Sequence, residues 1–153
     1  MKLYQSILKN NLVNILLTFS DEGLHTIQFD GKDKDVIFEL SKDNKYLKQL
    51  EEYYAGKRKT FDLPLVLVGT PFQIKVWEYL QQIPYGKTQT YQDVAKGIGH
   101  PRSSRAVGNA NHVNPIPIII PCHRVIRTDK GLGGFGGGID VKKRLLDFEK
   151  KYL

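Results

Sequence analysis

The segment from Pro115 to Val125 constrains the fold of this chain more than any other. Its sequence is PIPIIIPCHRV, and it holds Cys122, the only cysteine among 153 residues. The apolar, β-branched run predicts a short buried strand. Pro121 has no N–H for a sheet ladder, so the strand should end there and present the Cys122 thiol beside the His123 imidazole.

Two interpretations of Cys122 are open at this point. Free cysteines are among the most often buried residue types, which favours a structural core residue. A thiol beside a proton acceptor is also a recurring way to make a nucleophile, which favours a catalytic residue. The adjacent His123 and the flanking prolines are what bring the catalytic interpretation into consideration.

Composition excludes several classes of protein. Hydrophobic residues make up 41% and charged residues 25% of the chain, as is typical of soluble globular proteins. No apolar run approaches the roughly 20 residues that span a bilayer, and the first residues hold no signal-peptide core. One cysteine cannot close an internal disulfide, and no Cys or His cluster indicates a metal. We therefore expect a cytoplasmic protein with no metal, no cofactor and no membrane partner.

The positive charge is confined to one half of the chain. Residues 1–68 hold ten Lys or Arg and ten Asp or Glu, whereas residues 69–153 hold thirteen and six, so the second half carries the whole net charge of +7. A basic half that also contains the cysteine favours a polyanionic partner, nucleic acid first. The alternative is a lysine-rich surface with no such partner.

Residues 1–68 are predicted to form a small N-terminal α/β domain. Segments 13–19 and 24–29 have the pattern of strands, and the turn residues between them predict a hairpin. Tyr and Leu side chains at helical spacing predict a helix over about 43–56. Nothing in this domain indicates chemistry, and residues 63–69 are expected to link it to the second domain.

The second domain, residues 69–153, is predicted to contain a helix-turn-helix. Thr70 begins a capping box and should start a first helix, and Thr90 should cap a short second one. Glycines should end that helix, and a third should follow over about 101–111. The predicted fold class is therefore α+β: a small N-terminal α/β domain, then a mostly helical domain with a helix-turn-helix and a short strand ending at Cys122.

The third predicted helix has an unusual surface. Its candidate DNA-binding residues are Ser103, Ser104, Arg105, Ala106, Gly108 and Ala110. The small residues would let a partner's backbone approach closely, while the serines and the arginine can contact phosphates. Few side chains are available to read base edges, so the pattern favours sequence-indifferent binding, for which a minor groove is suitable. A tight contact between helices is the alternative.

A glycine-rich segment, residues 131–138, follows the Cys-His pair. It is not a phosphate-binding P-loop, because no Gly-Lys-Ser/Thr follows. Such a segment is either a flexible linker or a wall where backbone approaches a ligand, and the helices predicted around it favour the wall. Asp140 should then cap the last helix, and Glu149 falls near the end of that helix.

Together these features resemble the O6-alkylguanine-DNA alkyltransferases, or methylated-DNA–protein-cysteine methyltransferases. The resemblance covers about residues 69–149. The matching segments are Thr70–Trp77, Ile83–Thr88, Arg105–Ala110, Asn114–Pro117 and Pro121–Val125. The resemblance implies a monomer that repairs double-stranded DNA by direct reversal. It would transfer the alkyl group of O6-alkylguanine, and of O4-alkylthymine, irreversibly to its own cysteine in a single turnover.

The resemblance also implies roles for the residues around the cysteine. Cys122 would accept the alkyl group, and His123 would deprotonate the thiol through a water. Glu149 would orient the imidazole, and Asn114 would hold the active-site turn.

Further roles implied by the resemblance concern the DNA. Tyr91 would meet the phosphate beside the flipped nucleotide and donate to N3 of the base, and Arg105 would fill the vacated stack. The Val125 carbonyl would accept from the guanine amino group, and Phe135 and Gly136 would cover the base. Many relatives carry Tyr and a polar residue at these last two positions. Ring stacking and a backbone N–H are therefore expected here instead.

Three other functions are less consistent with the residues. A cysteine hydrolase needs an oxyanion hole, and its Cys and His usually lie far apart in sequence. A non-catalytic binder of alkylated DNA would lack the acceptor cysteine. A helix-turn-helix transcription regulator would need base-reading side chains on the third helix and usually a dimer.

Overall fold

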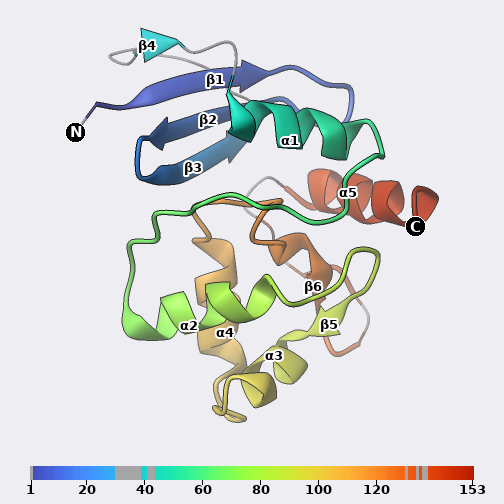
Figure 1. The fold of residues 1–153 in the computed structure, drawn as a ribbon. Coiled ribbons are helices and arrows are strands. Elements are labelled where there is room, and N and C mark those ends of the chain that lie inside the picture. Colours follow the sequence, from blue (N-terminus) through green and yellow to red (C-terminus); the bar gives the residue numbers. More distant parts are fainter. Residues whose placement is uncertain (1, 30–38, 41–43, 130, 134, 136–137) are drawn as a thin grey trace. The chain divides into compact units, whose positions relative to one another are not determined.

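The computed structural model describes residues 2–29, 39–40, 44–129, 131–133, 135 and 138–153. The chain divides into two compact units, Met1–Leu67 and Val68–Leu153 (Figure 1).

The first unit contains a four-stranded sheet in the order β3-β2-β1-β4 (Figure 1). Its strands are β1 (Tyr4–Leu8), β2 (Ile15–Ser20), β3 (Gly23–Phe29) and β4 (Glu39–Leu40). β2 pairs antiparallel with both β1 and β3, and β4 pairs parallel with β1. The predicted hairpin is confirmed as β2 and β3, whereas the sequence patterns did not predict β1 or β4.

One helix, α1 (Lys45–Tyr54), completes this unit. The Asn44 side chain accepts a hydrogen bond from Leu47 N and so caps the helix. Leu50 and Tyr53 are fully buried, which places the apolar face of the helix in the core. The helix predicted over 43–56 is thus confirmed in type and lies within those bounds.

The second unit is mostly helical. Its helices are α2 (Pro71–Leu80), α3 (Tyr91–Gly97), α4 (Ser104–His112) and α5 (Ile139–Lys151). Two short parallel strands, β5 (Gln89–Thr90) and β6 (Val125–Ile126), accompany them, and a 3₁₀ turn over Cys122–Arg124 leads into β6. The capping boxes at Thr70 and Thr90 both form, so the predicted starts of α2 and α3 are confirmed.

The helix-turn-helix is formed by α3 and α4. Gly99 in the turn has a φ of +81°, a conformation that favours glycine. Gln92 of α3 fixes the turn, because its Nε2 donates to the Pro101 carbonyl at 2.8 Å and its Oε1 accepts from Ser104 Oγ at 2.7 Å. Trp77 of α2 is a core residue, as predicted, and its Nε1 donates to the Ala110 carbonyl at 2.9 Å. These bonds hold α4 firmly against its neighbours.

The segment before Cys122 differs from the prediction. Residues 114–121 are all described, and none lies in a strand; the short strand, β6, follows Cys122 instead of ending there. The Asn114 side chain accepts from Ile116 N at 2.9 Å and donates to the Ile120 carbonyl at 2.7 Å, which folds the segment into a loop. Ile118 has a φ of 74°, and the prolines lack the N–H that a ladder needs. The β-branched side chains fill the core from this loop.

The last helix also begins differently from the prediction. Gly138 occupies the N-cap position and Asp140 lies in the first turn, so the expected cap at Asp140 is wrong. The buried residues of α5 are Lys142, Leu145 and Glu149. Lys142 and Glu149 carry charge, so this buried face of α5 holds two titratable groups as well as an apolar core residue. None of the described helices is long and apolar enough to cross a membrane.

Candidate active site

Cys122 is the first residue of the 3₁₀ turn, and its side chain is buried, with 3% of its surface exposed. Burial raises the pKa of the thiol to about 11, although a hydrogen bond with the Asn114 side chain and the charge of Lys142 act in the opposite direction. The resting thiol is therefore protonated near neutral pH. A reaction at sulfur needs a base that can remove this proton.

His123 and Glu149 form a buried pair beside the cysteine. His123 Nε2 lies 2.6 Å from Glu149 Oε2. The same carboxylate accepts hydrogen bonds at 2.9 Å from both Nε and Nη2 of Arg124, and one at 3.2 Å from Gly86 N. Arg124 Nη1 donates to the Ile83 carbonyl at 2.8 Å. Glu149 thus joins α5 to the turn that carries Cys122.

The charges of this pair determine which nitrogen of His123 can act as a base. Burial by itself raises the pKa of Glu149, but hydrogen bonds from His123 and Arg124 hold it well below its ordinary value. Burial lowers the pKa of His123 despite the opposing effect of Glu149, so the imidazole is neutral. Beside an ionised carboxylate, Nε2 carries the proton and donates it, which leaves Nδ1 as the acceptor. Among the described residues, Nδ1 has no hydrogen-bond partner.

A second buried cation interacts electrostatically with the cysteine. Lys142 is fully buried, and its Nζ donates to the Val125 carbonyl at 2.6 Å. Burial lowers its pKa to about 8, while the charge of the Cys122 thiolate raises it. Within the described chain, no carboxylate forms an ion pair with this ammonium. Its charge therefore favours the thiolate form of Cys122.

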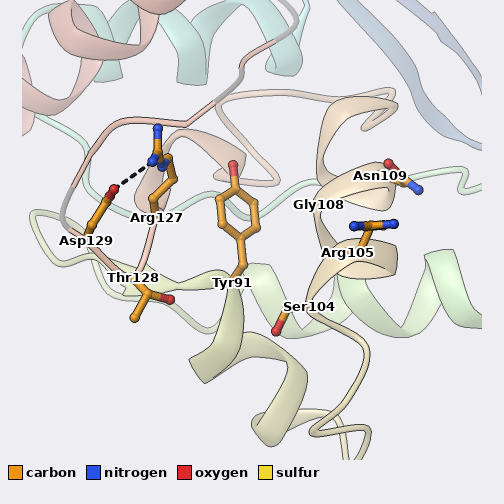
Figure 2. Close-up of a pocket in the computed structure, with 8 residues that line it drawn as sticks. All are labelled: Tyr91, Ser104, Arg105, Gly108, Asn109, Arg127, Thr128 and Asp129. Carbon is orange, nitrogen blue, oxygen red and sulfur yellow. Dashed lines mark hydrogen bonds and ion pairs between the residues drawn. The ribbon is translucent and has the colours of Figure 1, made fainter.

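Tyr91 begins α3 and points into a hollow on the surface of this unit (Figure 2). Burial and the charge of Cys122 raise the pKa of Tyr91, and a side-chain hydrogen bond with Asn111 partly opposes them. The hydroxyl therefore keeps its proton and can donate it in a hydrogen bond. Gly133 has a φ of +74°, and a Cβ there would lie 2.8 Å from the Tyr91 hydroxyl oxygen. Gly133, a described residue of the glycine-rich segment, thus lies against Tyr91, which favours the wall interpretation.

This hollow, called here the Tyr91 hollow, has a volume of about 620 Å³. It is lined by Tyr91, Ser104, Arg105, Gly108, Asn109, Arg127, Thr128 and Asp129 (Figure 2). Three of the predicted DNA-binding residues of α4, Ser104, Arg105 and Gly108, are therefore brought together with Tyr91. These four residues form one surface, and the guanidinium of Arg105 is exposed at one side of it.

The other predicted residues of α4 lie outside this lining. Ala106 is exposed and Ser103 is half-buried. Ala110 is 2% exposed, and its carbonyl accepts from Trp77. Ala110 was expected on an exposed face of small residues, and this is wrong, because it packs against α2 inside the unit.

The predicted base pocket is only partly described. Val125 is fully buried, and its carbonyl is the acceptor of the Lys142 ammonium. Phe135 is buried. Gly136 lies outside the described residues, so its predicted role stays a prediction.

Sequence reasoning missed Lys142, Arg124 and Asn111. Asn111 Nδ2 donates to the Cys122 carbonyl at 3.3 Å and so links α4 to the turn that carries Cys122. Lysines on helices are usually solvated, so a buried lysine at position 142 was not expected. One signal was present: Lys142 precedes Glu149 by seven residues, so the two lie on the same face of α5.

Family models match both units of the chain. Residues 71–151 match the DNA-binding domain of 6-O-methylguanine DNA methyltransferase. Residues 3–67 match the ribonuclease-like domain of 6-O-methylguanine DNA methyltransferase. The two matches leave only the ends of the chain and a short link uncovered.

Individual proteins and structures agree with these matches. A methylated-DNA–protein-cysteine methyltransferase of Methanosarcina acetivorans is 44% identical over 153 residues, covering 96% of this chain and 98% of the relative. The crystal structure of Mycobacterium tuberculosis O6-methylguanine methyltransferase is similar with a TM-score of 0.89 and 36% identity, covering 99% of this chain and 94% of that one. A Mycobacterium tuberculosis OGT in complex with DNA gives a TM-score of 0.88 at 37% identity, covering 97% and 94%.

Proposed function

The chain belongs to the 6-O-methylguanine DNA methyltransferase family, and from this premise we propose that Cys122 is the residue that receives the alkyl group. The protein is a methylated-DNA–protein-cysteine methyltransferase, which repairs DNA by direct reversal. The observation that supports Cys122 is its buried thiol next to a His–Glu pair in which Nδ1 is the accepting nitrogen. A non-catalytic binder of alkylated DNA is not favoured, because the full-length relatives bear the transferase name.

The geometry supports the following reaction. His123 Nδ1 takes the thiol proton through a water, and Glu149 stabilises the imidazolium that forms. The Cys122 sulfur attacks the alkyl carbon, a carbon–sulfur bond forms, and the carbon–O6 bond breaks with its electron pair moving to the guanine. Tyr91 donates a hydrogen bond to N3 and so stabilises the leaving base. The guanine finally takes up the proton that the thiol has lost.

The same proposal assigns DNA binding to α4 and Tyr91. A base must leave the duplex to meet a buried thiol, which costs a few kcal/mol of lost stacking and pairing. Arg105 lies on the exposed part of the Tyr91 hollow, where a guanidinium can enter the space that the base vacates. This would offset part of the cost.

Replacing Arg105 by alanine should slow repair of duplex DNA by about tenfold or more. Base extrusion costs a few kcal/mol, and without the guanidinium less of this cost is offset. Duplex affinity should weaken only modestly, and repair of a single-stranded oligonucleotide should change little. Single-turnover transfer rates on both substrates measure this. Arg102→Ala is the matched control, because Arg102 is exposed but does not line the Tyr91 hollow. An unchanged duplex rate in Arg105→Ala would remove Arg105 from this role.

The stoichiometry of the reaction tests the proposed function. Cys122 is the only thiol in the chain, and a thioether has no easy leaving path. Incubated with excess duplex containing O6-methylguanine, the protein should take up one methyl group per molecule and stop. Mass spectrometry should find it on the peptide that contains Cys122, with Cys122→Ala as the blank. Multiple turnovers, or methanol released into water, would instead indicate a hydrolase.

The unpaired cysteine also bears on location. Cys122 is buried and reduced, and the proposed chemistry consumes its thiol. A reducing compartment preserves such a thiol. We therefore propose that the protein acts in the cytoplasm.

A further inference from the structure

Two arginines line opposite sides of the Tyr91 hollow, and only one of them has a role so far. Arg105 projects from α4, whereas Arg127 lies in the segment after β6, on the other side of Tyr91 (Figure 2). Arg127 is paired with Asp129, and neither residue takes part in the reaction proposed above. Their geometry indicates a contribution to DNA binding that is separate from α4.

Arg127 makes contacts along its whole length. Its backbone N–H donates to the Gly131 carbonyl at 2.8 Å. A Cβ added at Gly131 or Gly133 would lie 3.6 or 3.4 Å from the side-chain stem of Arg127, so the stem packs against both glycines. Its Nη2 donates to Asp129 Oδ2 at 2.6 Å. A cation that is ordered before a ligand arrives loses less conformational freedom on binding.

Asp129 holds this arrangement through both carboxylate oxygens. Oδ1 accepts from Gly131 N at 2.9 Å and closes the turn, while Oδ2 accepts from Arg127. The two side chains are 60% and 59% exposed, and exposed ion pairs are weak. A phosphate can accept two parallel hydrogen bonds from a guanidinium, so it can replace Asp129 as the partner. Before DNA binds, the Arg127 guanidinium offsets the charge of the Asp129 carboxylate, which would otherwise repel DNA.

We propose that Arg127 is a preorganised phosphate-binding residue and that Asp129 is its counterion in the free protein, displaced by a DNA phosphate. The inference rests on the proposed function, because it requires duplex DNA to enter the Tyr91 hollow. DNA is then held from both sides of Tyr91. The contact carries no sequence information, so it acts equally on undamaged and alkylated DNA.

The salt dependence of binding tests Arg127. Losing one phosphate contact lowers the slope of log affinity against log salt by about 0.9. Arg127→Gln should show this loss, and weaker binding, to the same degree on an O6-methylguanine duplex and on its undamaged counterpart. Arg127→Lys, which keeps the charge, should retain most of the slope. Lys150→Gln is the matched control: it also removes one positive charge, from an exposed side chain outside the Tyr91 hollow. If Arg127→Gln behaves like Lys150→Gln, the proposal is wrong.

A double-mutant cycle tests Asp129. Asp129→Asn keeps an oxygen for Gly131 N but removes the charge that competes with phosphate. It should tighten duplex binding several-fold, and this gain should vanish when Arg127 is already glutamine. An equal gain in both backgrounds would mean that Asp129 only repels DNA and does not act through Arg127, which contradicts the proposal.

Failure of this inference and failure of the proposed function give different results. If the proposed function fails, the wild-type protein takes up no methyl group on Cys122 from the alkylated duplex. If only this inference fails, the wild type is methylated once per molecule, and Arg127→Gln has the salt slope of the Lys150→Gln control.

Discussion

Glu149→Gln should slow methyl transfer by about 10²–10⁴-fold, the range that general-base catalysis contributes. The reason is the tautomer of His123. If the amide turns its NH₂ group toward Nε2 of His123, Nε2 must accept a hydrogen bond. The imidazole proton then moves to Nδ1, which can no longer act as the proposed base. If the amide is turned the other way, its NH₂ group lies against the Arg124 N–H groups, so that donors face donors. The measurement is the single-turnover rate with a methylated duplex. The extent of methyl transfer should stay at one methyl group per molecule.

The same substitution should also destabilise the fold. Arg124 is buried with Glu149 as its counterion, at 2.9 Å from both Nε and Nη2. Breaking a buried pair by neutralising one partner costs about 3–5 kcal/mol. Asp147→Asn, the same change at an exposed position of α5, should leave both stability and rate nearly unchanged.

A second variant separates stability from chemistry. Arg124→Met combined with Glu149→Gln removes both charges, so it should recover much of the stability. It should not recover the rate, because His123 still lacks its carboxylate. A Glu149→Gln protein that is folded and transfers methyl within a few-fold of the wild-type rate would show that the carboxylate does not orient the base.

Local sequence signals predicted local structure well in this chain. The caps at Thr70 and Thr90 depend only on residues within the same turn, so the starts of α2 and α3 follow from the sequence. The Pro115–Pro121 segment was mispredicted because β-branched residues favour strands in general. Here the side chain of Asn114 bonds to the backbone on both sides of the run, and this competing interaction gives a loop.

The site was harder to predict where it depends on tertiary contacts. Cys122 and His123 are adjacent in sequence and therefore visible together. Their partners Glu149 and Lys142 come from α5, and only packing decides that this helix turns two charged side chains inward. Periodicity could place Lys142 on the face of Glu149, but no pattern in the sequence specifies that a lysine there is fully buried.

Replacing Lys142 by methionine should make the protein more stable near neutral pH but less reactive. Methionine fills a similar volume without a buried charge, and exchanging buried charges for apolar groups is often neutral or stabilising. The Cys122 thiol would lose a nearby positive charge, so its pKa of about 11 should rise further and its thiolate should become rarer. Each pKa unit of that rise lowers the thiolate fraction tenfold. The effect on the transfer rate is smaller, because a more basic thiolate is also a better nucleophile. We expect transfer at pH 7 to slow by about three- to tenfold.

The pH dependence of stability identifies the buried ammonium as the cause. The pKa of Lys142 is about 8 in the folded protein and 10.5 without burial, so between these values the unfolded chain binds more protons. The stability of the wild type relative to Lys142→Met should therefore rise with pH between about 8 and 10.5, and stay level below 8. The slope is at most about 1.4 kcal/mol per pH unit. Cys122 is present in both proteins, so its own titration largely cancels below pH 10.

Urea unfolding of the two proteins at pH 7, 8, 9 and 10 measures this difference. Lys143→Met, at the neighbouring exposed position of α5, serves as the control and should give a difference that is level across the range. A Lys142→Met difference that is also level would mean that the buried amine keeps its ordinary pKa. Its charge would then be stabilised by an interaction other than the Val125 carbonyl, and the loss of reactivity in the variant would have to come from packing.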